Sequence, residues 1–128
     1  MNILAAIVDP LNYAALEKGI SARAVQALIR KGALRLDDVY SAIPERTFKR
    51  RLADEAALRM DEADAIARMV RTVALAAWAM GDRKSGQLFL DQPNPALGNR
   101  VPRKMALTDA GAREVEALLY RFVAGDPA

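Results

Sequence analysis

The sequence predicts an all-helical protein, and three observations favour that class. Apolar residues recur at spacings of three and four along most of the chain, which is the period of a helix face. No stretch of useful length alternates between apolar and polar residues as a strand would. Hydrophobic residues fill 52% of the 128 positions but aromatic ones only 5%, so small and aliphatic side chains must pack the helices closely. We expect two parts, residues 1–60 and residues 61–128.

The composition argues against several classes of functional site. The chain has neither cysteine nor histidine, so it lacks thiolate metal ligands, disulfides and the commonest general base. It also lacks a phosphate-binding glycine loop and a nucleophile placed beside a base. We therefore expect no enzyme activity, no metal ion and no cofactor.

Residues 1–8 are apolar, but they have no basic leader and end at Asp9 and Pro10. No other run approaches the roughly 18 apolar residues that a membrane span requires. The sequence thus predicts a soluble, cytoplasmic protein with no membrane partner. Whether residues 1–8 extend the first helix, pack as a separate arm or pack across a dimer stays open.

Capping residues mark the first helices. Asp9 followed by Pro10 has the pattern of an N-cap and first helical position, with Gly19 as the stop. Ser21 is the next predicted N-cap, and Gly32 ends the helix that it opens.

A short helix and a basic helix follow, joined by a tight turn. Asp37 or Asp38 opens the short helix, which ends before Pro44 because the residue before a proline is pushed out of the helical region. Pro44 then begins a helix whose Phe48 points inward. A helix, a tight turn and a basic helix form the outline of a helix-turn-helix, whose second helix enters the major groove of DNA.

The positive charge favours the same interpretation. Residues 1–60 hold ten lysines and arginines against seven acidic residues, whereas residues 61–128 hold nine of each. Such an excess in one part suggests a polyanionic partner. We expect Arg46 and Thr47 to reach base edges, and Lys49, Arg50 and Arg51 to contact phosphates. The alternative, a solvated basic helix on the surface of a bundle, stays open.

The second part begins with the longest helix, which starts in the acidic run at residues 61–64 and ends at Gly81. Its stripe of apolar residues, with Trp78 beside it, is expected to be core. Asp82 opens a shorter helix, residues 103–107 allow one turn, and Thr108 caps the last helix. The last apolar stripe consists of Val115, Leu118, Leu119 and Phe122.

Residues 92–102 contain three prolines and one glycine, which excludes a regular helix. Gly98 permits a positive φ, and Asn94 and Asn99 tolerate unusual backbone angles. Such a rigid loop is either shaped for binding or a stiff corner between helices.

The second part resembles the C-terminal toxin-binding domain of Xre/MbcA/ParS-type antitoxins. The resemblance lies in Leu-Phe-Leu at residues 88–90, Pro-Asn-Pro-Ala-Leu-Gly at 93–98, Pro102, and the helix that Thr108 opens. Residues 43–51 are similar to the recognition helix of that family's Xre-like helix-turn-helix, so the resemblance covers roughly residues 20–123. Asn99 stands where the family has a second glycine. The basic pair Arg103 and Lys104 replaces an acidic turn, which suggests a differently charged partner.

The resemblance implies a type II antitoxin that occludes the active site of a RES-domain toxin encoded by the adjacent gene, an enzyme that consumes NAD or uses it for ADP-ribosylation. It also implies repression of the shared promoter through operator DNA, and a homodimer. The alternative is a helix-turn-helix transcriptional regulator with a C-terminal oligomerisation domain and no toxin partner. The residues expected to bind the toxin are Asn94, Leu97, Gly98, Arg100, Arg121, Asp126 and Ala128, because a rigid loop loses little entropy on docking and a tail can enter a cleft.

Overall fold

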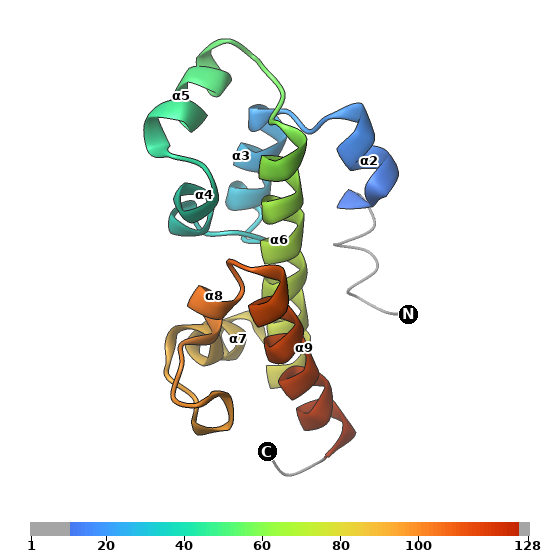
Figure 1. The fold of residues 1–128 in the computed structure, drawn as a ribbon, viewed down its shortest axis with the longest axis vertical. Coiled ribbons are helices and arrows are strands. Elements are labelled where there is room, and N and C mark those ends of the chain that lie inside the picture. The colour runs from blue at the N-terminus through green and yellow to red at the C-terminus, as the bar shows by residue number, and fades with distance from the viewer. Residues whose placement is uncertain (1–10, 126–128) are drawn as a thin grey trace.

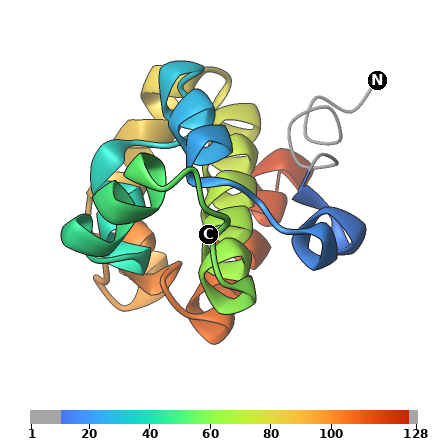
Figure 2. The ribbon, with the colours of Figure 1, turned by 90° about the horizontal axis from the view of Figure 1, so that it is seen from above.

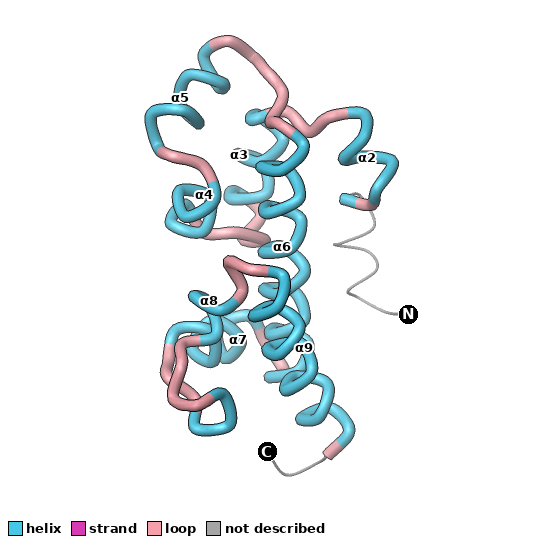
Figure 3. Tube along the Cα trace, in the orientation of Figure 1, coloured by secondary structure: helices cyan, strands magenta, loops and turns pink. Residues whose placement is uncertain are grey.

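The computed structural model describes residues 11–125, and every regular element in that range is helical (Figures 1 and 3). The predicted all-helical class is confirmed. The elements in chain order are α2 (Tyr13–Lys18), α3 (Ala22–Arg30), α4 (Leu36–Ala42), α5 (Glu45–Ala53), α6 (Met60–Met80), α7 (Arg83–Asp91), the 3-10 helix η2 (Pro95–Leu97), α8 (Pro102–Met105) and α9 (Asp109–Ala124).

Helix α6 is the axis of the molecule. The helices α2 to α5 gather around its N-terminal half and α7 to α9 around its C-terminal half (Figure 1). Seen from above, α2 lies on the opposite side of α6 from α4 and α5 (Figure 2). Ile66, Val70 and Leu75 of α6 are all buried in a core to which both halves contribute. A boundary between residues 60 and 61 stays a prediction, since α6 packs against helices of both parts.

The predicted caps of three helices are confirmed by their hydrogen bonds. The side-chain oxygens of Ser21, Asp82 and Thr108 accept from the backbone N–H three residues later, at 3.0, 2.7 and 3.0 Å. Gly81 ends α6 with a φ of 99°, a conformation that glycine adopts at low cost. The long helix and the last helix therefore begin and end close to where the sequence places them.

The starts of α2 and α4 are set by other residues than the predicted caps, and only that of α4 can be compared with its prediction. Helix α2 begins at Tyr13, and the side chain of Asn12 caps it by accepting from the N–H of Ala15 at 3.0 Å. The predicted cap at Asp9 and Pro10 lies outside the described residues. Helix α4 begins at Leu36, before the predicted caps Asp37 and Asp38. Asp38 lies in the first turn, where its carboxylate accepts from the backbone N–H of Arg35, the residue at the N-cap, at 2.9 Å.

The expectation that Trp78 belongs to the core is wrong. The side chain is 41% exposed and packs edge-on against Tyr120 of α9, with ring centroids 6.3 Å apart. The buried stripe of α6 runs through Val70, Val73 and Ala74, and Trp78 lies near the end of the helix. No helix of the described residues combines the length and hydrophobicity that crossing a bilayer requires.

Candidate functional site

The turn between α4 and α5 consists of Ile43 and Pro44 alone. Ile43 is fully buried and Phe48 is 2% exposed, so both anchor the turn in the core. Tyr40 of α4 meets Phe48 of α5 edge-on, at a centroid distance of 6.3 Å. These contacts hold α4 and α5 together across the turn, and two helices joined by so short a turn are consistent with the predicted helix-turn-helix.

Three of the five predicted DNA-binding side chains share the exposed face of α5. Arg46, Lys49 and Arg50 are all exposed. Lys49 Nζ lies 3.0 Å from a carboxylate oxygen of Glu45, and the hydrogen bond to Glu45 raises the pKa of Lys49. Arg46 and Arg50 make no ion pair with any other residue in the range 11–125. This face therefore presents three cations to solvent.

The other two predicted DNA-binding residues lie on the flank of α5 that faces α6. Thr47 and Arg51 line a cavity of about 310 Å³ between α5 and the start of α6. Arg50 also lines this cavity, although its side chain is exposed. The Arg51 side chain is only 17% exposed and pairs with Glu62 at 3.1 Å. Since Glu62 is itself 6% exposed, this pair compensates the charge of Arg51 inside the protein. The geometry thus favours a structural role for Arg51 over a phosphate contact.

The loop at residues 92–102 is closed by hydrogen bonds between its own residues. The N–H of Asn94 donates to the carbonyl of Arg100 at 3.1 Å, and the N–H of Asn99 donates to the carbonyl of Asn94 at 2.9 Å. The side chain of Asn94 accepts from the N–H of Ala96 at 2.9 Å. Gly98 and Asn99 have φ values of 65° and 62°, so both take the predicted left-handed conformation. Asn99 therefore adopts a backbone conformation that glycine also adopts readily.

Some of the predicted toxin-binding residues are exposed to solvent and others are buried or half-buried. Leu97 is 7% exposed and anchors the loop in the core, and Asn94 is half-buried and engaged in the turn. Gly98 and Arg100 are exposed at the tip, as is Arg121 on α9. Helix η2 packs against α9, so the loop and the last helix form one continuous region. Asp126 and Ala128 lie outside the described residues.

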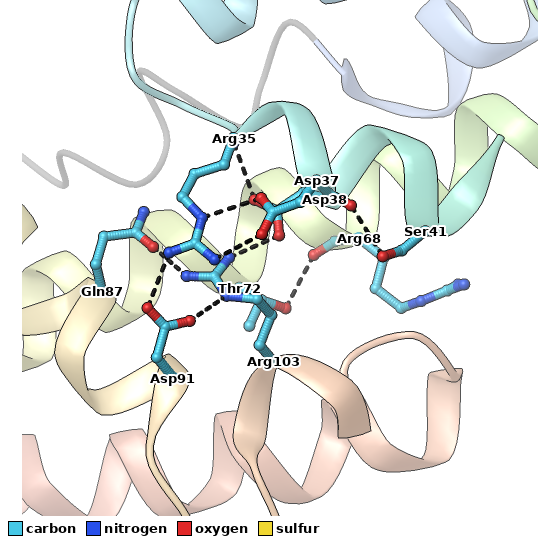
Figure 4. A network of polar contacts seen from close by, with 9 residues as sticks. All are labelled: Arg35, Asp37, Asp38, Ser41, Arg68, Thr72, Gln87, Asp91 and Arg103. Carbon is cyan, nitrogen blue, oxygen red and sulfur yellow. Dashed lines mark hydrogen bonds and ion pairs between the residues drawn. The ribbon is translucent and has the colours of Figure 1, made fainter. Parts of the chain in front are cut away.

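A partly buried polar network joins the two halves of the chain (Figure 4). Arg103 of α8 pairs with Asp38 of α4 at 2.6 Å and with Asp91 of α7 at 2.7 Å, and it also donates to Gln87. The Asp38 side chain is fully buried and that of Arg103 is 12% exposed. Arg35 pairs with Asp91 at 2.8 Å, which closes the network across the two halves. The charge of Arg103 is therefore compensated by residues of its own chain. The differently charged partner suggested by Arg103 and Lys104 stays a prediction, to which only the exposed Lys104 can contribute a surface charge.

Two carboxylates at the edge of this network, Asp37 and Asp91, have lowered pKa values. The hydrogen bond from Arg35 lowers the pKa of Asp37. At Asp91, burial raises the pKa, but the hydrogen bonds from Arg103 and Arg35 outweigh it and lower the pKa below its ordinary value. Both carboxylates are thus held in the charged form by their arginine partners.

Two pairs of residues, one buried and one exposed, were not predicted from the sequence. Asp38 and Arg103 are 65 positions apart, and no local spacing connects them. Trp78 and Tyr120 form an exposed aromatic pair on α6 and α9. Such pairs are enriched at protein interfaces, and a stripe drawn from α6 alone gives no sign of them.

Comparison with known proteins agrees with the resemblance seen in the sequence. Residues 74–125 match the family described as the antitoxin Xre/MbcA/ParS C-terminal toxin-binding domain. The chain is also similar to a protein named Antitoxin Xre from Pseudomonas putida strain KT2440. The two are 27% identical over 107 residues, which cover 84% of this chain and 67% of that relative.

Proposed function

The chain carries the toxin-binding domain of the Xre/MbcA/ParS-type antitoxins of toxin–antitoxin systems, and on this premise we propose that it neutralises a RES-domain toxin encoded by the adjacent gene. The match over residues 74–125 is the observation that supports this most directly. In the proposed mechanism the antitoxin performs no chemistry. It covers the toxin's active site, so that the toxin no longer consumes NAD or transfers ADP-ribose from it.

The toxin side of the proposal uses the loop tip and the last helix. Gly98 and Arg100 are exposed on a turn that is already closed by its own hydrogen bonds, so docking would cost little conformational entropy. Arg121 is exposed on α9, the helix against which η2 packs. We propose that these residues, together with residues 122–128, form the contact surface.

Co-expression tests the toxin side. Cells producing the protein of the adjacent gene should survive with the intact antitoxin. They should die with an antitoxin lacking residues 121–128 or carrying the Arg100→Ala and Arg121→Ala substitutions. Arg113→Ala is the matched control, because Arg113 is an exposed arginine of the same helix whose partner is Asp109, one turn away. Equal protection by every variant would place the inhibitory surface elsewhere.

The DNA side of the proposal uses the exposed face of α5. We propose that Arg46, Lys49 and Arg50 contact operator DNA and that the antitoxin thereby represses its own operon. Three neutralised phosphates per subunit predict a slope of about −2.7 for log affinity against log salt. A homodimer would double that slope, since each subunit would present one helix to one half-site.

Promoter binding by the Arg46→Ala, Lys49→Ala, Arg50→Ala triple variant tests this side. Binding should be lost while toxin neutralisation persists. Arg23→Ala is the matched control, because Arg23 is an exposed arginine of α3 that pairs with Glu55. Unchanged promoter affinity in the triple variant would remove α5 as the recognition helix. If instead DNA binding is confirmed and the neighbouring gene encodes no toxic protein, the chain is a transcriptional regulator without a toxin partner.

A further inference from the structure

A groove of about 690 Å³ opens between α2, α3 and α6, on the part of the molecule that the proposed functions do not use. Its walls are mainly apolar, and Leu11, Ile20, Leu28, Val70 and Val73 contribute the largest of these side chains. The buried stripe of α6 forms the floor, so the groove is continuous with the core. An apolar concavity of this kind marks a site that another apolar element covers.

The charges around the groove restrict what that element is. Lys18, Lys31 and Arg83 line the groove, and none of its lining residues is acidic. An apolar occupant with an acidic end therefore suits both the walls and the rim.

Helix α2 is incompletely packed in the same region. It has six residues and none of them is buried, and Tyr13 is 69% exposed. Helices this short are marginal in water and depend on tertiary packing for their stability. One apolar segment lying in the groove would therefore cover the groove and also pack against α2.

The sequence just before the described residues has the required character. Ile3, Leu4, Ile7 and Val8 are apolar, and Asp9 follows them as the acidic end. A segment that is hydrophobic all round is normally buried. Residues 9 and 10 alone separate it from Leu11, which itself lines the groove.

We propose that residues 3–8 dock into the groove of their own chain, with Asp9 near the basic rim. The short tether decides between this segment and the same segment of a second copy. A site tethered by two residues meets its ligand at an effective concentration in the millimolar range, far above that of another chain in a dilute solution. Docking would pin α2 against α3 and α6 and so complete the core of the N-terminal half.

Crosslinking locates the segment directly, because the protein has no cysteine of its own. The variant I7C/A24C places one thiol in the segment and one on Ala24, a residue of α3 that lines the groove. Oxidation should give a monomer with an internal disulfide on a non-reducing gel. The control I7C/R30C, with its second thiol outside the lining of the groove, should stay reduced. A disulfide-linked dimer from I7C/A24C, or free thiols in both variants, would overturn docking within the chain.

Hydrogen exchange of the full chain gives a second readout that does not depend on disulfide geometry. Substituting Ile3 and Ile7 with aspartate should accelerate exchange of the α2 amides at least tenfold and leave α9 unchanged. The conservative substitutions Ile3→Val and Ile7→Val should keep the slow exchange. Equal exchange of α2 in the aspartate variant and the parent protein would contradict the proposal.

Discussion

Replacing Arg103 with alanine should be among the most damaging single changes in this protein. Arg103 lies in α8, directly after the proline-rich loop, and its guanidinium binds Asp38, Asp91 and Gln87. The Asp38 side chain is fully buried, so the variant leaves a buried carboxylate without its ion pair. Removing one partner of a buried pair typically costs about 3–5 kcal/mol.

We expect the lower end of that range, because Asp38 keeps the hydrogen bond from the N–H of Arg35 at 2.9 Å. A loss of about 3 kcal/mol lowers the unfolding midpoint of a chain of 128 residues by about 12 °C, at about 4 °C per kcal/mol. Thermal and urea unfolding followed by circular dichroism measure both quantities. Lys104→Ala is the matched control, because Lys104 is exposed and forms no ion pair among residues 11–125.

A double-mutant cycle identifies the interaction responsible. If Asp38 and Arg103 stabilise the fold through each other, the Asp38→Ala, Arg103→Ala variant should be less destabilised than the sum of its single variants by at least about 1 kcal/mol. Strict additivity, or a loss below about 1 kcal/mol for Arg103→Ala alone, would refute the view that this network holds the two halves together.

Three further predictions concern packing, pH and capping. Gly86→Ala should destabilise the fold by about 1–3 kcal/mol, because an added Cβ would lie 2.6 Å from the backbone nitrogen of Ala77, where α7 packs on α6. Lys84→Ala in the same helix is the control, and equal unfolding midpoints of the two variants would show that α7 can move away from α6 without cost. Acidification should lower the free energy of unfolding, because the pKa values of Asp37 and Asp91 are lower in the folded protein than their ordinary value of 3.8. The stability that their ion pairs contribute is complete above pH 3.8 and is lost as the pH falls below it, so a free energy of unfolding that rises on acidification would contradict the ion pairs. Thr108→Ala should cost about 1 kcal/mol and Thr108→Ser much less, since a hydroxyl at this position accepts from the N–H of Gly111; equal unfolding free energies for the two variants would exclude the cap.

The sequence anticipates what depends on neighbouring residues. Ser21, Asp82 and Thr108 cap their helices as predicted, because a cap is a hydrogen bond across three positions. The positive φ of Asn99 follows in the same way from the tolerance of asparagine for that conformation. These are properties of short segments, and residue types alone identify them.

What escapes the sequence is the direction in which a charged or aromatic side chain points once the helices pack. Arg51 belongs to a run of cations, yet it turns toward Glu62 because the start of α6 lies beside that flank of α5. The sequence around Arg103 suggests a surface charge, but in the fold α4 and α7 place Asp38 and Asp91 beside it. Trp78 shows the converse, an aromatic side chain near the end of α6 that stays exposed. Each of these depends on contacts between distant segments, which no spacing along the chain encodes.

The binding of a toxin by residues 74–125 is the central claim, and one measurement tests it most directly. The protein of the adjacent gene is co-expressed with the tagged antitoxin, and affinity purification is followed by an assay of NAD consumption before and after the antitoxin is removed by denaturation and refolding. We predict a stable complex that is inactive until the antitoxin is removed, and a toxin that kills cells when produced alone. A neighbouring protein that is harmless alone and does not co-purify would contradict the assignment.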